Sequence, residues 1–495
     1  MALRARVVAP PVPTQSVWQH HTAKWGELPS HVFWKGDRRM EAETYLSTGY
    51  GLRLAIEERT TGWRRLEQMA DVRQPPRLKG IHVSPDFGTP FLAATQIFDI
   101  RPVPRKWLAI DKIDDAASLF TRTGFILVTR SGSVGRATLA TDALKGVLCS
   151  DDLLRVEARV PEQWGWLYAY LYSLQAQAMM SSAQYGHIIK HLETSHLDAL
   201  PVPVVKDDIA VNFHKRTQEI LDLCNHAYRL TLEAEERFAA AIGPIEQVNQ
   251  ETGFEVRAVA LFAKRRRLEA CFHAPGPAAI LHRFKAINAT VEPLSKVTEK
   301  VWWMTRFRRF YGEDGIPYLS ADELFTTNPP ESKRILIESN DNHESYFVKQ
   351  GWIVMACSGQ IYGLNGAACL MTEHHENIFF SHDLIRIVPK SDAIRAGYLL
   401  TTLTHLMLGR PILIRTAYGT SIPHLDPSDV SAFPVVRLIS GEEAAIADLA
   451  EQAAAERARA DVLERDLAAD AGNFIERFIA GDLESFVTVR SVGKI

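Results

Sequence analysis

Two stretches, Gly-Phe-Ile-Leu-Val-Thr-Arg-Ser-Gly at 124–132 and Gly-Trp-Ile-Val-Met-Ala-Cys-Ser-Gly at 351–359, follow one pattern at an offset of 227 residues. Each places apolar, largely β-branched residues between glycines, which indicates a buried strand followed by a turn. Further pairs recur in the same order at offsets up to 233: 38–42 with 266–270, 77–81 with 306–310, 88–92 with 315–319, 150–155 with 381–386, 185–192 with 418–425, and 201–202 with 434–435. The chain is therefore a tandem duplication of a unit of about 230 residues.

The overall composition is that of a folded globular protein. Of 495 residues, 46% are hydrophobic and 23% charged, which excludes wholesale disorder. Because no apolar run reaches about 18 residues, we expect no transmembrane helix. The first 15 residues lack an apolar core of a signal peptide, and the five cysteines are widely spaced without a CxxC pair. These features predict a cytoplasmic protein with reduced thiols and no membrane partner.

The formal net charge of −3 conceals a local separation of charge. Basic residues open each copy of the repeat: Arg64, Arg65, Arg73, Arg77 and Lys79 in the first, and Arg306, Arg308 and Arg309 in the second. A second basic group, Arg101, Arg105 and Lys106, follows in the first copy. Acidic residues gather in the long polar segment at the end of each copy. Local positive charge is what binding to DNA phosphates requires, although a solvated basic face explains each cluster equally well when it is taken alone.

Each copy is predicted to contain a mixed α/β body. We expect strands at Phe125–Thr129, Leu153–Val156, Trp352–Met355 and Leu384–Val388, and helices at Trp164–Met180 and Ala393–Leu408. Gly186 and Gly419 follow a tyrosine in equivalent turns, where they suit a positive φ.

Each body is followed by a long helical tail. Residues 206–242 contain neither proline nor glycine, and a heptad seam runs through Ile446, Ala453, Ala460 and Leu467 in the segment 442–480. A straight helix of at least 35 residues is about 50 Å long. Its apolar stripe needs a partner, most simply the other tail. The alternative is that each tail folds back on its own body.

The ordered motifs resemble a known family. The series "RFRRFYGEDGIPYLSADELF", "GWIVMACSGQIYG", "SHDLIRIVP", "YGTSIPHL" and "FPVV", and its counterpart in the first half, are similar to target-recognition domains of type I restriction–modification specificity subunits. The resemblance covers about residues 60–243 and 285–480. It implies that each domain reads half of a bipartite DNA site, and that two antiparallel helices act as a spacer and dock methyltransferase subunits. It also implies no catalysis and no cofactor in this chain, with S-adenosylmethionine, ATP and Mg²⁺ on partner subunits, and restriction subunits joining indirectly.

The expected fold class is α+β. Two tandem mixed α/β domains each precede a long helix, and the helices pair as an antiparallel coiled-coil spacer with pseudo-two-fold symmetry. The expected boundaries are an N-terminal extension 1–60, recognition domain 61–205, spacer helix 206–243, connector 244–284, recognition domain 285–437, spacer helix 438–480 and a tail 481–495. In this arrangement the helices set a spacing near one DNA turn, roughly 34 Å.

Candidate DNA-binding residues lie in the basic openings and in two loops of each repeat. Small residues let a backbone approach phosphates, while Arg, Gln, Ser and Thr read base edges. In the first repeat the candidates are Arg77, Lys79, Arg130, Ser131, Ser133, Arg136, Tyr185, His187 and Lys190. In the second repeat they are Arg306, Arg308, Arg309, Ser358, Gln360, Tyr362, Tyr418, Thr420 and Ser421. Because the two sets differ, we expect an asymmetric site. Residues that match in both copies, such as Ser150-Asp152-Arg155 and Ser381-Asp383-Arg386, are expected to hold the fold instead.

Other signals favour different functions less well. Asn328-Pro329-Pro330 is followed by Glu331, where an amino-methyltransferase motif needs an aromatic residue. The stretch 373–376, Glu-His-His-Glu, lacks the HExxH spacing of a zinc site and is interpreted as a loop. The alternatives left open are a nuclease or methyltransferase acting on DNA by itself, and a repeat scaffold that binds proteins.

Overall fold

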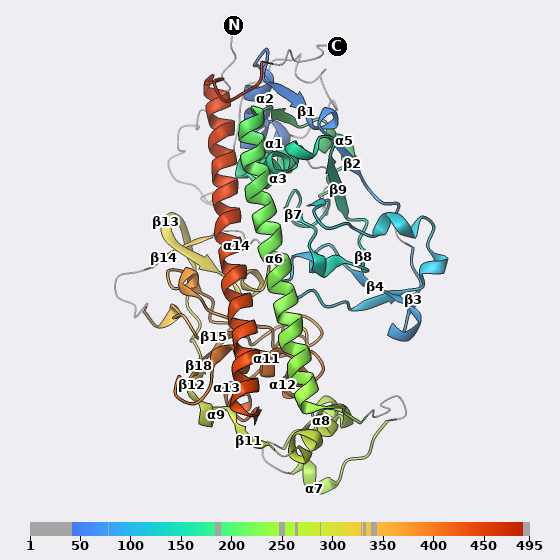
Figure 1. The fold of residues 1–495 in the computed structure, drawn as a ribbon, viewed down its shortest axis with the longest axis vertical. Coiled ribbons are helices and arrows are strands. Elements are labelled where there is room, and N and C mark those ends of the chain that lie inside the picture. The colour runs from blue at the N-terminus through green and yellow to red at the C-terminus, as the bar shows by residue number, and fades with distance from the viewer. Residues whose placement is uncertain are drawn as a thin grey trace, which may run out of the picture. The chain divides into compact units, whose positions relative to one another are not determined.

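The computed structural model describes residues 42–77, 79–183, 190–246, 253–262, 266–287, 289–327, 329, 333–337 and 344–488. They form two compact units (Figure 1). Of the described residues, unit 1 takes in those up to Ile97, those within Lys106–Leu221 and those from Leu463 onward. Unit 2 consists of Phe98–Arg105 and Asp222–Val462. Within the described residues, every helix is too short or too polar to cross a membrane.

Apart from the long helices described below, the elements of unit 1 are short helices and short strands. Its helices are α1 (Ala42–Tyr45), α2 (Thr48–Glu57), α3 (Trp164–Tyr172), α4 (Leu174–Ala183) and α5 (Thr194–Asp198). Its strands are β1 (Trp63–Arg65), β2 (Ala70–Arg73), β3 (His82–Val83), β4 (Thr89–Leu92), β5 (Lys106–Leu108), β6 (Ile126–Thr129), β7 (Ala137–Leu139), β8 (Leu148–Cys149), β9 (Leu153–Ala158) and β10 (Pro201–Pro203).

Unit 2 has the same kinds of element in a similar order. Its helices are α7 (Ala258–Leu261), α8 (Pro275–Ala286), α9 (Leu294–Val297), α10 (Ala321–Leu324), α11 (Ala396–Thr404), α12 (Gly409–Ile414) and α13 (Pro427–Ser431). Its strands are β11 (Thr290–Pro293), β12 (Thr298–Trp303), β13 (Phe310–Leu319), β14 (Arg334–Leu336), β15 (Ile353–Ala356), β16 (Ala368–Leu370), β17 (Phe379–Phe380), β18 (Leu384–Pro389) and β19 (Pro434–Arg437). Two long helices, α6 (Asp207–Ile242) and α14 (Ser440–Ala480), contribute residues to both units.

The sequence repeat corresponds to a repeat in sheet topology. The main sheet has the order β2-β9-β6-β7 in unit 1 and β12-β18-β15-β16 in unit 2. Strands β1 and β10 pair antiparallel, as do β11 and β19. The parallel pair β4–β8 is matched by β13–β17, and both pairs lie at equivalent positions of the repeat. The two bodies are therefore two copies of one mixed α/β arrangement.

The four predicted strands are confirmed, but both predicted body helices are interrupted. The helix expected at Trp164–Met180 breaks at Ser173, whose extended backbone ends α3 and whose hydroxyl accepts a hydrogen bond from the amide of Ala176 in α4. The helix expected at Ala393–Leu408 ends at Thr404, because His405 turns the chain away (φ −52°, ψ 122°). The positive φ predicted for Gly419 is confirmed at +99°, whereas Gly186 lies outside the described residues.

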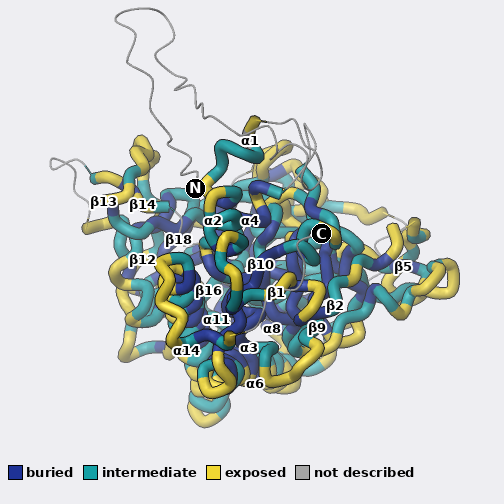
Figure 2. Tube along the Cα trace, turned by 90° about the horizontal axis from the view of Figure 1, so that it is seen from above, coloured by how far each residue is buried: buried dark blue, intermediate teal, exposed yellow. Residues whose placement is uncertain are grey.

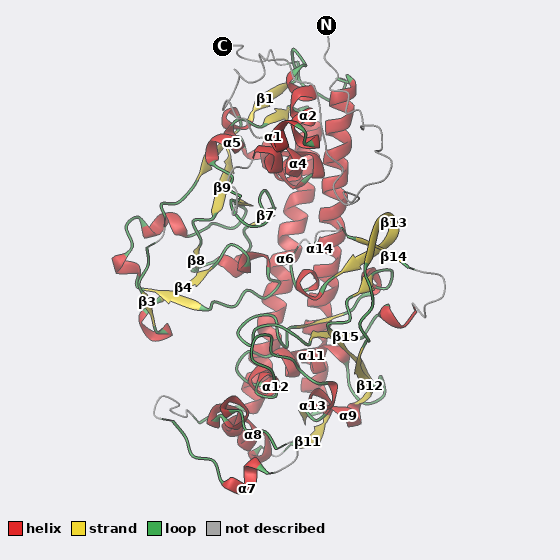
Figure 3. Cartoon of the chain, turned by 180° about the vertical axis from the view of Figure 1, so that it is seen from behind, coloured by secondary structure: helices red, strands yellow, loops and turns green. Residues whose placement is uncertain are grey.

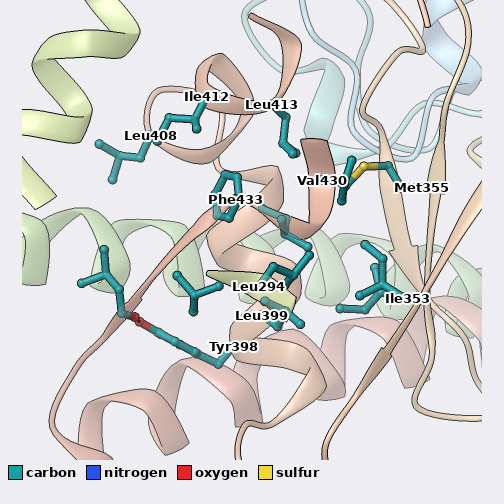
Figure 4. Packing of buried hydrophobic residues seen from close by; sticks show 14 of the residues in the cluster. Leu294, Ile353, Met355, Tyr398, Leu399, Leu408, Ile412, Leu413, Val430 and Phe433 are labelled. Atoms are coloured by element: carbon teal, nitrogen blue, oxygen red, sulfur yellow. The ribbon is translucent and has the colours of Figure 1, made fainter. Parts of the chain in front are cut away.

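The main core of unit 2 forms around the inner face of its sheet. Ile353 of β15 lies toward Leu399 of α11, and Met355 lies beside Val430 of α13 (Figure 4). Phe433 and Leu294 belong to the same cluster. Alternate residues of β15 point to opposite faces, so Val354 and Ala356 belong to a second cluster on the other side. Strand β15 is buried on both faces, which explains its continuous run of apolar residues.

The two tail helices are present and contact each other within each unit. In unit 2, His226 lies 2.7 Å from Glu456, Arg237 lies 3.7 Å from Glu442, and Ala227 and Leu230 pack with Ala453. These partners run in opposite directions along the chain, so this part of the pair is antiparallel (Figure 1). In unit 1, Arg216 lies 2.7 Å from Asp470, and Phe213 packs edge-on against Phe474. The seam residues Ile446, Ala453, Ala460 and Leu467 are all buried.

Part of the expected N-terminal extension packs in unit 1. Helix α2 lies against α4, and the closest approach is at Gly49, where an added Cβ would lie 1.9 Å from the carbonyl oxygen of Ala178 (Figure 3). Helix α8, which lies mostly in the expected connector, contacts α12 in unit 2 (Figure 3). Helices α2 and α8 follow the repeated segments 38–42 and 266–270, so each repeat includes a helix that lies mostly before the expected recognition domain.

Candidate nucleic-acid interface

The first-repeat loop between β6 and β7 is held by backbone hydrogen bonds at its start. The amide of Arg130 donates to the carbonyl of Asp152 at 2.9 Å, and the amide of Leu192 donates to the carbonyl of Arg130 at 2.9 Å. Ser131 forms an isolated bridge with His191. The loop therefore lies between the turn that precedes β9 and the residues that follow the Tyr-Gly segment.

The side chain of Arg130 is occupied within the protein. Its guanidinium lies 2.7 Å from the carboxylate of Glu193 and 3.5 Å from that of Asp152, and only 18% of the side chain is exposed. These two ion pairs help to fix the loop. The DNA contact expected for Arg130 stays a prediction.

The other first-repeat candidates differ in accessibility. Ser133 is exposed, and Gly132 and Gly135 on either side of it have φ of +75° and +80°. Half-buried candidates are Ser131, Arg136 and Lys190, and exposed ones are Arg77 and Lys79 between β2 and β3. Tyr185 and His187 lie outside the described residues.

In the second repeat, the two predicted loops meet. Ser358 forms a bridge with His424, and the amide of Gly359 donates to the carbonyl of Pro423 at 3.2 Å. The side-chain amide of Gln360 donates to the carbonyl of Ser421 at 3.0 Å. Exposed side chains on this double loop are Gln360, Tyr362, Tyr418, Thr420 and Ser421, whereas Ser358 is half-buried. We call the described residues 358–363 and 418–424 the double loop.

The basic segment of the second repeat adjoins the double loop through Asp383. The carboxylate of Asp383 lies 3.7 Å from the guanidinium of Arg309, while its carbonyl accepts from the amide of Cys357 at 3.3 Å. Arg306, Arg308 and Arg309 are all exposed. Hydrogen-bonding side chains suited to base edges and cations suited to phosphates thus lie on either side of one turn.

The residues expected to hold the fold do so. Arg155 is buried, and its guanidinium donates to the carbonyls of Ser150 and Cys149 at 2.9 Å each. Arg386 is also buried, and it donates to the carbonyls of Leu384 and Tyr346. Burial lowers the pKa of both guanidinium groups to about 10. Each buried arginine therefore ties the turn before β9 or β18 to its surroundings.

Sequence reasoning missed two residues that support the double loop. Arg267 is buried and donates to the carbonyls of Thr416 and Ala417 at 2.9 and 2.8 Å, immediately before Tyr418. Arg410 donates to the carbonyl of Gly363 at 2.6 Å. Arg267 belongs to the repeated Arg-Arg-x-Glu-Ala motif, so that repetition was a signal for its structural importance. Arg410 carried no such signal.

Metal-ligand geometry and thiol pKa can be assessed for the described residues. No group of His, Cys, Asp and Glu side chains among them is arranged to hold a metal ion. Glu373–His375 form a short 3₁₀ turn, as the loop interpretation predicted, and burial lowers the pKa of His375 to about 4. Burial raises the pKa of the Cys149 and Cys357 thiols to about 11, which suppresses the reactive thiolate. Asn328, Pro330 and Glu331 lie outside the described residues.

Several solved structures are similar to this chain at low sequence identity. The S subunit of a type I restriction–modification system from M. genitalium is 14% identical, covers 85% of this chain and 96% of its own, and superposes with a TM-score of 0.35. The structural neighbours include type I specificity subunits and a type IIG restriction endonuclease that matches 35% of this chain. The specificity subunit from Thermoanaerobacter tengcongensis is 15% identical over 85% of this chain and 97% of its own, with a TM-score of 0.24. A chain from a structure of type I system assembly and conformational transition is 14% identical over 85% and 98%, with a TM-score of 0.25. The sequence matches no protein-family model and no curated protein.

Proposed function

We propose that this chain is the DNA-specificity subunit of a type I-like restriction–modification system or a related phage-defence system. The proposal rests on one observation above all. Equivalent loops after β6 and β15 are bridged to equivalent segments, through Ser131–His191 and Ser358–His424, yet carry different side chains. A shared scaffold with divergent loops is what two readers of different half-sites need.

The long helices supply the rest of the proposed role. Helices α6 and α14 act as a spacer between the two recognition domains and dock methyltransferase subunits, through which restriction subunits join. The chain has no catalysis of its own; S-adenosylmethionine, ATP and Mg²⁺ belong to those partners. The proposal places the protein in the cytoplasm, where its DNA target and thiol-reducing conditions are found.

Methylation mapping tests this function directly. Genomes of cells with and without the gene for this chain are compared for modified bases. We expect an asymmetric bipartite motif that is methylated only when the chain is present. If the same motifs are methylated with and without the chain, the proposal is wrong.

Two assays on purified full-length protein separate the alternatives. A nuclease or methyltransferase would act on DNA without partners, whereas a specificity subunit would not. A scaffold for proteins would show no dependence of duplex affinity on salt, whereas a subunit that neutralises phosphates shows a negative slope of log affinity against log salt concentration. Cleavage or methylation of DNA by the purified chain alone would favour an enzyme. Duplex affinity that does not depend on salt would favour a protein-binding scaffold.

A further inference from the structure

A segment from the first repeat is built into unit 2. Residues Phe98–Arg105, which we call the crossover segment, lie in the chain between β4 and β5 of unit 1 but pack in unit 2. The amide of Ile100 donates to the carbonyl of Phe325 at 2.9 Å, and the amide of Thr327 donates to the carbonyl of Phe98 at 2.6 Å. The main chain of the crossover segment is therefore tied to residues that follow α10.

The middle of the crossover segment is anchored by Arg101. Its guanidinium forms an ion pair with Glu235 of α6, with only 25% and 12% of the two side chains exposed. The same guanidinium lies 5.7 Å from the ring centroid of Tyr228. A sheltered ion pair with an added cation–π contact fixes the direction in which the segment continues toward Arg105.

The end of the crossover segment reaches the double loop. The guanidinium of Arg105 lies 5.8 Å from the ring centroid of Tyr362. A Cβ added to Gly363 would lie 3.1 Å from a terminal nitrogen of Arg105, so the cation is close to the loop backbone as well. Arg410 binds the carbonyl of Gly363. The stretch Gln360–Gly363 is thus contacted by two arginines, one from each repeat.

We propose that Arg105, encoded in the first repeat, is a positioning residue for Tyr362 and so helps set the base preference of the half-site read by the second repeat. This inference rests on the proposed function. Tyr362 is 62% exposed and so accessible to DNA, while the cation beside its ring restricts the orientation of the side chain. The specificity of the second repeat then depends partly on a residue outside it.

A pair of adjacent substitutions isolates the contact. Arg105 and Lys106 are adjacent, both exposed, and carry the same charge. Figure 2 shows intermediate and exposed stretches around β5, which begins at Lys106. Full-length Arg105→Ala and Lys106→Ala proteins are used to select binders from a pool of random-sequence duplex DNA, and the selected DNA is sequenced. We expect Arg105→Ala to lower base discrimination in the second half-site by about threefold, as loss of an exposed cation–π contact predicts. Lys106→Ala should leave base discrimination unchanged in both half-sites. Arg105→Ala should leave it unchanged in the first half-site.

A double-mutant cycle separates positioning from direct DNA contact. Tyr362→Phe keeps the ring and should preserve the effect of Arg105→Ala, whereas in a Tyr362→Leu background Arg105→Ala should have no further effect on base discrimination. Thermal unfolding of all variants should match that of the wild type.

Four results would overturn the inference. Additive effects of Arg105→Ala and Tyr362→Leu would mean that Arg105 contacts DNA independently. An equal loss at both half-sites would mean a phosphate contact. Absence of salt-dependent duplex binding by the wild-type chain would overturn the proposed function, and the inference with it; normal wild-type selectivity with an unaltered Arg105→Ala variant would overturn the inference alone.

Discussion

One arginine of the first repeat has no counterpart in the second repeat, whereas another arginine has the same role in both. Arg130 lies between two carboxylates, while its counterpart in the second repeat is the buried Cys357. Arg155 and Arg386, by contrast, bind main-chain carbonyls in both copies. The sequence comparison predicted the second pair because its members match. It could not predict the ion pairs of Arg130, since Glu193 lies 63 residues away and both partners look like ordinary surface charges.

A buried histidine makes stability depend on pH. Burial, with a smaller contribution from nearby Arg101, lowers the pKa of His405 to about 4, although a hydrogen bond with the backbone of Glu235 opposes the shift. The unfolded chain takes up a proton near pH 6.5 while the folded protein does not, so stability falls as pH drops from 6.5 toward 4. Between pH 7.5 and 5 this residue should cost about 2 kcal/mol of unfolding free energy.

Urea unfolding at the two pH values measures that contribution. The difference in unfolding free energy between pH 7.5 and pH 5 should shrink by about 2 kcal/mol in His405→Gln. His82→Gln, which alters an exposed histidine, is the control and should leave the difference unchanged. If His405→Gln also leaves it unchanged, His405 is not neutral in the folded protein.

At the scale of elements, strand positions were predictable and helix ends were not. Strands β6 and β15 carry uninterrupted apolar runs, so their burial was visible in the sequence. The break at Ser173 depends on a local hydrogen bond of its side chain, which competes with helix continuation. The packing of α2 was missed because its tight contact depends on Gly49, and a glycine within a helix gives no apolar signal.

Two glycines of α2 test whether this helix is part of the fold. Gly49→Ala should destabilise unit 1 by about 1–3 kcal/mol, because its methyl group overlaps the backbone at Ala178. Gly51 has nothing within 4 Å of an added Cβ, so Gly51→Ala should be neutral or stabilise by up to about 1 kcal/mol through helix propensity. Chemical unfolding compares the two proteins. Equal stabilities would mean that α2 does not pack on α4 in solution.

The helix pair invites a similar comparison. Ala453 is buried against Ala227 and Leu230, and Ala455 is exposed two residues later. Ala453→Glu should lower the unfolding free energy by about 2–4 kcal/mol, because a charge enters an apolar contact without a partner. Ala455→Glu, with the same change in helix propensity and charge, should have little effect. Similar losses in both variants would argue against packing of α6 on α14 at this level.

At the scale of the whole molecule, the net charge is a poor guide to electrostatics. The total of −3 combines exposed arginines near the double loop with acidic residues on α6 and α14. Removing one phosphate contact lowers the salt slope by about one and leaves base preference unchanged, whereas removing a base contact does the reverse.

Arg308→Ala and Gln360→Ala distinguish these two contributions. We expect Arg308→Ala to weaken duplex binding for all sequences and to reduce the slope of log affinity against log salt. Gln360→Ala should relax base preference in one half-site with the slope retained. Fluorescence anisotropy across a salt series, together with sequenced selections, measures both quantities. The reverse pattern would exchange the roles assigned to these residues.

Unit 1 combines segments that lie far apart in the sequence, and this affects how the chain folds while it is being synthesised. Trp166 and Phe213 pack against Phe474, and the amide of Lys206 donates to the carbonyl of Ser485. The first part of unit 1 ends at Leu221, and its last part begins at Leu463. A ribosome adding about 5–20 residues per second needs roughly 12–50 seconds to cover that interval. During this time the nascent first repeat presents uncovered aromatic surface, so its survival in the cell depends on shielding until the C-terminal helix emerges.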